Sequence, residues 1–165
     1  MCFIVRFKFT FSIECARKFQ LFACMTLGIF GFGGTGKAMA RRAVGFGMRV
    51  IALDREEMEV SDGADEVVGP EGFESMLARS DVVSICCPLT PETRGKFDSS
   101  TFSAMKDEAL LVNVTRGEVM VEEDLVVALR EGVIAGAALD VAPREPLPEN
   151  SELWTLENVV MSPHT

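Results

Sequence analysis

Three glycines with the spacing Gly31-x-Gly33-x-x-Gly36 stand where an apolar run, residues 27–32, meets a helical pattern at residues 35–47. Between a strand and a helix, the first glycine permits a tight turn, and the second lets the backbone approach an anion. The third lets the helix pack closely on the strand. The free N–H groups of the first helical turn point at the anion. A glycine-rich loop without a ligand is the alternative, and the spacing alone does not decide between the two.

Asp54 ends the next apolar run, 18 residues beyond Gly36. A carboxylate about 20 residues after the triplet is typical of domains that bind a dinucleotide, where it accepts hydrogen bonds from the adenosine ribose. Its negative charge repels a 2′-phosphate, so the sequence favours NAD. NADP is the less favoured alternative, because Arg55 follows directly. We therefore expect Gly31, Gly33, Gly36 and Asp54 to bind NAD.

Apolar runs and helical patterns alternate along the rest of the chain. The apolar runs are continuous, which favours parallel strands that are buried on both faces of a sheet. Right-handed crossovers then make the sheet doubly wound. The sequence thus predicts an α/β fold, a Rossmann-type doubly wound parallel sheet with helices on both faces. We expect strands at residues 27–32, 49–54, 65–69, 81–87, 109–114, 135–141 and 158–162, and helices at residues 35–47, 73–80, 99–105 and 122–130.

Residues 1–26 differ from this pattern. A period of two predicts a half-buried strand there, with five apolar side chains on one face: Val5, Phe7, Phe9, Phe11 and Ile13. A secretory signal is disfavoured, because charges interrupt the apolar side chains and no A-x-A site follows. An organellar transit peptide and a non-native start of the reading frame both stay open. We leave residues 1–26 unassigned and place one NAD-binding domain at residues 27–165.

The charge of the chain is unevenly distributed. The net charge is −9, and residues 1–26 hold four basic side chains and one acidic one, which leaves 12 basic and 24 acidic residues for the remainder. An acidic body repels nucleic acid and anionic membranes, so we expect neither as a partner. No apolar stretch reaches the roughly 18 residues of a membrane span.

The cysteines and the single histidine point to a reducing compartment without a metal site. Five cysteines form no C-x-x-C pair, and Cys86 and Cys87 are adjacent in an apolar run. This is typical of buried thiols in a reducing compartment, so we expect a cytoplasmic protein. One histidine does not supply a zinc site of the usual spacing, and we expect no metal.

Three side chains suited to catalysis follow the later predicted strands: Arg116, Glu145 and His164. Ligands of doubly wound sheets bind beyond the carboxyl ends of the strands, so we expect these residues to lie near the dinucleotide. Each could also be an ordinary surface residue. Their joint placement beside a glycine loop favours a site.

Four stretches closely resemble one family, the D-isomer-specific 2-hydroxyacid dehydrogenases. They are residues 86–98 (CCPLTPETRGKFD), 110–141, 144–154 and 158–165 (NVVMSPHT). The combination of N-x-x-R-G, D-V-x-x-x-E-P and P-H is specific, and the similarity runs from about residue 27 to residue 165. It implies hydride transfer between NAD and a small 2-hydroxy or 2-oxo acid.

The resemblance also implies roles for single residues. Arg116 matches the arginine that holds the substrate carboxylate and polarises the 2-oxo group of the substrate. A planar guanidinium suits this role, because it can donate two parallel hydrogen bonds to a carboxylate. His164 matches the general acid/base, and Glu145 matches the carboxylate that orients its imidazole and favours the protonated form. Further implied cofactor contacts are Gly34, Thr35, Cys87, Pro88, Val114, Thr115, Arg116, Asp140 and His164.

The sequence departs from the family in extent. The family builds its substrate domain from an N-terminal part and the extreme C-terminal segment, whereas here the chain stops one residue after His164. We therefore expect weak or no turnover from this chain alone. The alternative is a non-catalytic dinucleotide-binding module, or an NADH-sensing protein similar to the family's transcriptional corepressors. A homodimer stays open.

Overall fold

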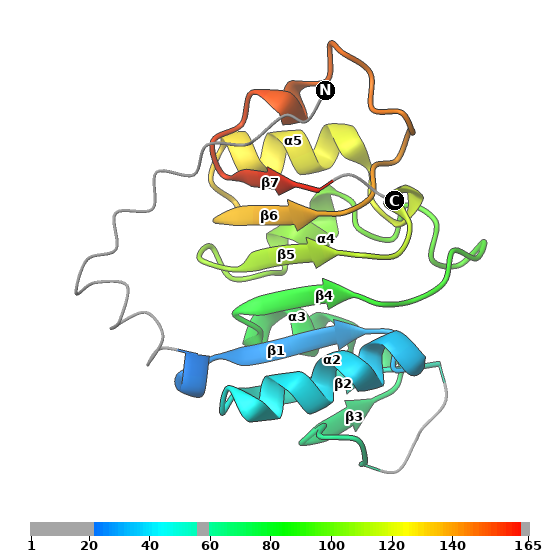
Figure 1. Cartoon of the computed structure of the whole chain (residues 1–165), viewed down its shortest axis with the longest axis vertical. Coiled ribbons are helices and arrows are strands. Elements are labelled where there is room, and N and C mark those ends of the chain that lie inside the picture. The colour runs from blue at the N-terminus through cyan, green and yellow to red at the C-terminus, as the bar shows by residue number, and fades with distance from the viewer. Residues whose placement is uncertain (1–21, 56–59, 163–165) are drawn as a thin grey trace.

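The computed structural model of the chain describes residues 22–55 and 60–162. Its centre is a seven-stranded sheet in which all neighbouring strands are parallel, in the order β3-β2-β1-β4-β5-β6-β7 (Figure 1). The strands are β1 (Thr26–Phe30), β2 (Arg49–Leu53), β3 (Glu66–Val68), β4 (Val82–Ile85), β5 (Leu110–Asn113), β6 (Gly136–Leu139) and β7 (Val159–Met161). The first strand lies inside the sheet between β2 and β4, and the later strands are added on either side of it, as a doubly wound sheet requires.

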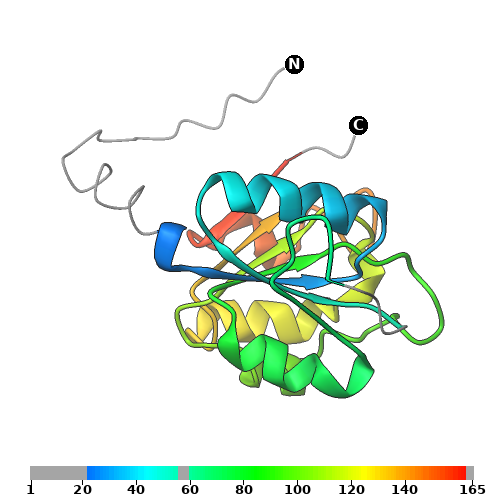
Figure 2. The same cartoon turned by 90° about the horizontal axis from the view of Figure 1, so that it is seen from below.

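Helices cover both faces of this sheet, which confirms the predicted fold. Figure 2 shows α2 on one face and the remaining α-helices on the other. The α-helices are α2 (Gly34–Gly45), α3 (Phe73–Arg79), α4 (Ser99–Ser103) and α5 (Glu122–Arg130), and the 3-10 helices are η1 (Phe22–Cys24), η2 (Pro70–Gly72), η3 (Gly117–Val119) and η4 (Glu152–Trp154). In the part of the chain that the structure describes, no helix is long and apolar enough to cross a membrane. The strand predicted within residues 5–13 lies outside the described residues.

The core has one part on each face of the sheet. Under α2, Leu27 and Ile29 of β1 pack with the small residues Ala40 and Ala43, so the helix lies close to the sheet. On the opposite face, Phe30, Phe73, Phe97 and Phe102 form a chain of ring contacts with centroids 5.1 to 6.3 Å apart. Burial on both faces explains why the strands read as continuous apolar runs.

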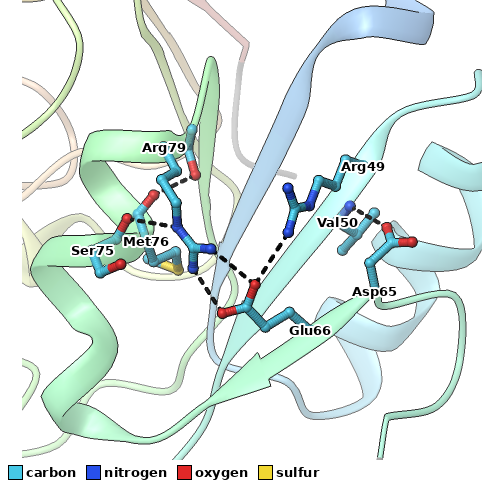
Figure 3. Close-up of polar contacts among 8 residues, drawn as sticks. Arg49, Val50, Asp65, Glu66, Ser75, Met76 and Arg79 are labelled. Carbon is cyan, nitrogen blue, oxygen red and sulfur yellow. Dashed lines mark hydrogen bonds and ion pairs between the residues drawn. The ribbon is translucent and has the colours of Figure 1, made fainter.

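An ion-pair cluster lies at the end of the sheet where the strands begin, whereas the glycine loop lies at the end where they finish. Arg49 begins β2 and Glu66 begins β3. The Glu66 carboxylate accepts two hydrogen bonds from the Arg79 guanidinium, at 2.8 and 2.9 Å, and a third from Arg49 at 3.4 Å (Figure 3). Because ligands of such sheets bind at the carboxyl ends of the strands, we interpret this cluster as structural.

Replacing Glu66 by glutamine is expected to lower the free energy of unfolding by about 0.5 kcal/mol at neutral pH, a small effect because the pair is partly exposed and screened. The hydrogen bond from Arg79 holds the pKa of the Glu66 carboxyl below its ordinary value. The stabilisation is therefore present above the unfolded-state pKa and is lost as the pH falls through the folded-state pKa. Urea unfolding of the native chain and of Glu66→Gln, at neutral and at acid pH, measures the difference in their free energies of unfolding. A difference that is the same at both pH values would contradict this prediction.

Candidate functional site

The glycine loop has the backbone geometry that its sequence predicts. Gly31 follows β1 with φ +101°, and a Cβ there would lie 2.6 Å from backbone atoms of Cys87. A Cβ on Gly36 would lie 2.2 Å from the carbonyl oxygen of Gly31. Both positions therefore require glycine, and the loop is held tightly between β1, α2 and the segment after β4.

The outer part of the same loop forms a cradle that can hold an anion. Gly33 and Gly34 are exposed, and a Cβ on either would meet no atom within 4 Å. Lys37 donates the first intrahelical hydrogen bond of α2, to Gly33 O at 2.9 Å, and Gly33 provides no side-chain cap. The N–H groups of Gly34, Thr35 and Gly36 are thus left at the positive end of the helix dipole. Free N–H groups at a helix N-terminus can bind an anion such as a phosphate.

The Asp54 carboxylate is held beside the glycine loop. Its Oδ2 accepts a hydrogen bond from Phe32 N at 2.8 Å, and its Oδ1 accepts one from Arg55 N at 2.7 Å. Each oxygen keeps a lone pair for a further donor. The half-buried Asp54 side chain is therefore oriented at the end of β2, where ribose hydroxyls could donate to it.

A cavity of about 530 Å³ lies beside Asp54 and the glycine loop. Its walls are mostly apolar and come from the ends of β1 and β2 and from the segments after β3 and β4. They include Gly31, Gly33, Leu53, Asp54, Pro70, Phe73, Cys87, Pro88 and Thr93. Pockets of this size and character suit a planar heterocyclic ligand such as an adenine ring.

Cys87 lies in the wall of this cavity as a protonated thiol. Burial raises its pKa to about 11, and burial likewise raises the pKa of Cys86. Both side chains are buried, and Cys86 Sγ lies 3.4 Å from Ser84 Oγ. Cys87 can thus line an apolar cofactor pocket without acting as a nucleophile at neutral pH.

At mildly alkaline pH, iodoacetamide is expected to modify the exposed Cys24 at least tenfold faster than Cys87, of which only about 0.1% is thiolate near pH 8. The modification of Cys87 should accelerate as the pH approaches 11, where the thiol ionises. Mass spectrometry of peptides from timed reactions measures both rates. Equal rates at the two cysteines would contradict the buried placement of Cys87.

Asn113 fixes the loop that carries Arg116. Its fully buried side chain donates from Nδ2 to the Arg116 carbonyl oxygen at 2.9 Å and accepts from Thr115 N at 3.1 Å. The loop Val114–Arg116 is thereby held at the end of β5. The Arg116 guanidinium is exposed and donates to Thr115 O at 2.7 Å. Sequence reasoning gave Asn113 no role, although it is the first residue of the N-x-x-R-G motif.

Gly117 joins this loop to the one after β6. A Cβ on Gly117 would lie only 1.9 Å from the carbonyl carbon of Ala142 and 2.3 Å from Pro143 N. In turn, Ala142 N donates to Glu145 Oε1 at 3.0 Å. The predicted residues Arg116 and Glu145 therefore belong to two loops in direct backbone contact.

The carboxyl ends of β6 and β7 lie on the same side of the sheet as the loops that carry Arg116 and Glu145. Asp140 N donates to Asn113 O at 3.0 Å, and the Ser162 hydroxyl donates to the Asp140 carboxylate. Asp140 thus lies between the loops after β5 and β7. His164 lies outside the described residues, so its pairing with Glu145 stays a prediction. Within residues 22–55 and 60–162, no group of three or more His, Cys, Asp or Glu side chains is placed to hold a metal ion.

Comparison with known proteins gives a consistent family. The family model for the D-isomer specific 2-hydroxyacid dehydrogenase, NAD binding domain, matches residues 11–165. A glyoxylate reductase of Korarchaeum cryptofilum is 46% identical over 142 residues, covering 84% of this chain and 42% of that protein. A glyoxylate reductase of Thermococcus litoralis is 45% identical over 141 residues, with coverages of 84% and 41%. The chain thus spans about two fifths of the length of these curated relatives.

Solved structures resemble the whole described domain. An NADPH-dependent glyoxylate/hydroxypyruvate reductase from Sinorhizobium meliloti, in apo form, superimposes with a TM-score of 0.82 at 36% identity, covering 87% of this chain and 73% of that one. A D-isomer specific 2-hydroxyacid dehydrogenase from Xanthobacter autotrophicus Py2, in complex with NADPH and MES, gives a TM-score of 0.82 at 38% identity and coverages of 86% and 45%. The sequence comparison and the structural comparison therefore both find glyoxylate reductases and 2-hydroxyacid dehydrogenases.

Proposed function

The chain belongs to the D-isomer specific 2-hydroxyacid dehydrogenase family, and we propose that it binds NAD as the cofactor domain of an oxidoreductase. The reaction would interconvert a D-2-hydroxy acid and its 2-oxo acid. The observation that carries this proposal is the Asp54 carboxylate, held by Phe32 N and Arg55 N beside an open glycine cradle. The cradle suits a pyrophosphate and the carboxylate suits ribose hydroxyls.

We favour NAD over NADP because of the charge at Asp54. A carboxylate that receives ribose hydroxyls repels a 2′-phosphate at the same place. Several solved relatives, including the two described above, carry NADP or NADPH in their names, and Arg55 beside Asp54 is the residue that would support NADP here. The two cofactors are therefore compared directly in the Discussion.

The remaining residues are proposed to prepare the substrate. Bound nicotinamide supplies the site to which, or from which, hydride moves. Arg116 holds the substrate carboxylate and polarises the 2-oxo group. His164 protonates the carbonyl oxygen in reduction and removes the hydroxyl proton in oxidation, for which an imidazole pKa of about 6.5 is suited. Glu145 orients the imidazole and favours its protonated form.

The proposed contacts along the cofactor follow the order of the strands. Gly31, Gly33, Gly34, Thr35 and Gly36 hold the pyrophosphate. Cys87 and Pro88 flank the adenosine, which agrees with their place in the wall of the cavity. Val114, Thr115 and Asp140 flank the nicotinamide.

The three described cysteines are free thiols, which supports a place in the reducing cytoplasm.

A titration with NADH tests this function. We expect saturable enhancement of nicotinamide fluorescence on binding, and at most trace reduction of glyoxylate, hydroxypyruvate or pyruvate by the 165-residue chain, because it spans about two fifths of its curated relatives. The absence of saturable binding would refute the proposal. Robust turnover that survives His164→Ala would refute the assigned acid/base.

The same pair of assays separates the second candidate, a dinucleotide-binding module without turnover. The glycine cradle and the oriented Asp54 carboxylate would serve such a module equally well. Tight binding of NADH without detectable turnover agrees with both candidates, because at most trace turnover is expected of this chain alone. Turnover that is abolished by Arg116→Ala would support the enzyme instead.

A further inference from the structure

Backbone hydrogen bonds tie the carboxyl ends of β5, β6 and β7 together. Just after β6, Asp140 N donates to Asn113 O, at the end of β5, over 3.0 Å. Just after β7, Ser162 N donates to Leu139 O over 2.9 Å. These two bonds continue the register of the paired strands beyond Leu139. They therefore fix the position of the Ser162 backbone beside that of Asp140.

The Ser162 side chain adds a second contact between the same two residues. Its hydroxyl donates to Asp140 Oδ1. The Asp140 side chain is half-buried, and among the described residues only Ser162 donates to its carboxylate. A carboxylate has two oxygens that can each accept hydrogen bonds. Oδ2 of Asp140 is therefore left for a donor that comes from outside the described chain.

We propose that Ser162 is a positioning residue for the nicotinamide end of the cofactor and that it acts through Asp140. This role rests on the proposed function, in which Asp140 flanks the nicotinamide. The carboxamide of nicotinamide carries an NH2 group, which donates to acceptors such as a carboxylate oxygen. Because the Ser162 hydroxyl holds Oδ1, Oδ2 is presented to this group in a fixed orientation.

A carboxylate that is held before binding gives tighter binding than one that is free to rotate. A free side chain loses its rotational freedom when a ligand orders it, and this loss reduces the affinity. The Asp140 backbone is bonded to Asn113, whose buried side chain also holds the loop Val114–Arg116. The acceptor for the carboxamide and the loop that carries Arg116 are thus anchored on one residue. A fixed nicotinamide would then keep its place relative to a substrate held by Arg116.

Ser162 can be substituted without disturbing the core. Its side chain is exposed, so alanine at this position leaves neither a buried cavity nor a buried polar group without a partner. Threonine keeps the hydroxyl, and the exposed position has room for its extra methyl group. Ser162→Ala and Ser162→Thr therefore separate the loss of the hydroxyl from the change of side chain.

Calorimetric titrations with NADH and with ADP-ribose test this role. ADP-ribose has the adenosine, the pyrophosphate and the second ribose but no nicotinamide. We expect Ser162→Ala to weaken NADH binding by about 3- to 10-fold, the effect of one side chain that must be ordered on binding. ADP-ribose affinity should stay unchanged, and Ser162→Thr should keep the native affinity for both ligands. In Asp140→Ala, which lacks the acceptor, the further change Ser162→Ala should cause no additional loss.

Ser151→Ala is the matched control. It removes a hydroxyl that donates to Glu122 Oε1 at 2.6 Å, and neither Ser151 nor Glu122 is among the proposed cofactor contacts. Both affinities should therefore stay at the native value in this variant.

Two kinds of failure can be told apart. If the native chain binds both ligands, and Ser162→Ala weakens both equally or neither, the positioning role is wrong. A loss of NADH affinity of the same size in the Asp140→Ala background would also overturn it, because Ser162 would then not act through Asp140. A native chain that binds neither ligand would refute the proposed function, and the positioning role with it.

Discussion

Replacing Gly117 by alanine is expected to lower the free energy of unfolding by about 3 kcal/mol, at the upper end of what overpacking usually costs. A Cβ at this position would overlap the backbone of Ala142, at 1.9 and 2.0 Å from its carbonyl atoms. Backbone atoms cannot move aside as a flexible side chain can. The two loops would have to separate, and with them Arg116 and Glu145.

Urea unfolding of the variant and of Gly45→Ala measures this effect. Gly45 is the last residue of α2, and an added Cβ there meets no atom within 4 Å, so Gly45→Ala should leave stability within about 0.5 kcal/mol of the native chain. If Gly117→Ala were as stable as Gly45→Ala, the contact between the two loops would be wrong. The assignment of Arg116 and Glu145 to one edge would then lose its main support.

Replacing Asp54 by alanine is expected to weaken NADH binding by about 10- to 100-fold, the effect of losing a charged hydrogen-bond acceptor. The carboxylate oxygens are already oriented by Phe32 N and Arg55 N, so the ribose hydroxyls would meet a fixed acceptor. The variant also removes the acceptor of two backbone N–H groups. Its thermal unfolding must therefore be compared with that of the native chain before the dissociation constants are compared.

Titrations with NADPH decide whether the charge of Asp54 selects the cofactor. The native chain should bind NADH more tightly than NADPH, and Asp54→Ala should reduce this preference by removing the repulsion. Arg55→Ala is the matched neighbour and should leave NADH affinity unchanged. A native chain that prefers NADPH, and loses that preference in Arg55→Ala, would show that Arg55 and not Asp54 selects the cofactor.

Much of the fold follows from local patterns in the sequence. Continuous apolar runs predicted each of the seven strands, because burial on both faces removes the alternation of polar residues. The predicted ends of the strands were less accurate where a backbone turn follows the strand. The first strand was expected to reach residue 32 but ends at Phe30, since the positive φ of Gly31 turns the chain. The 3-10 helices were not predicted, because three residues carry no periodic pattern.

Contacts between segments that are far apart in the chain could not be predicted from the sequence. Glu66 pairs with Arg79, and Gly117 packs on Ala142, only after the sheet has brought their segments together. The role of Asn113 also needed the structure, although its motif was visible. Apolar residues of β5 and β7 were expected to be buried on both sides, whereas Leu110 and Val160 remain exposed among the described residues.

The central claim is that a dinucleotide binds against bare backbone at Gly31–Gly36, with its adenosine ribose on Asp54. A crystal of the chain soaked with NADH tests it most directly. We predict electron density for the pyrophosphate at the N–H groups of Gly34 and Thr35, and ribose hydroxyls within hydrogen-bond distance of the Asp54 carboxylate. An empty cradle in a crystal soaked at saturating NADH, or a cofactor whose ribose lies away from Asp54, would contradict it.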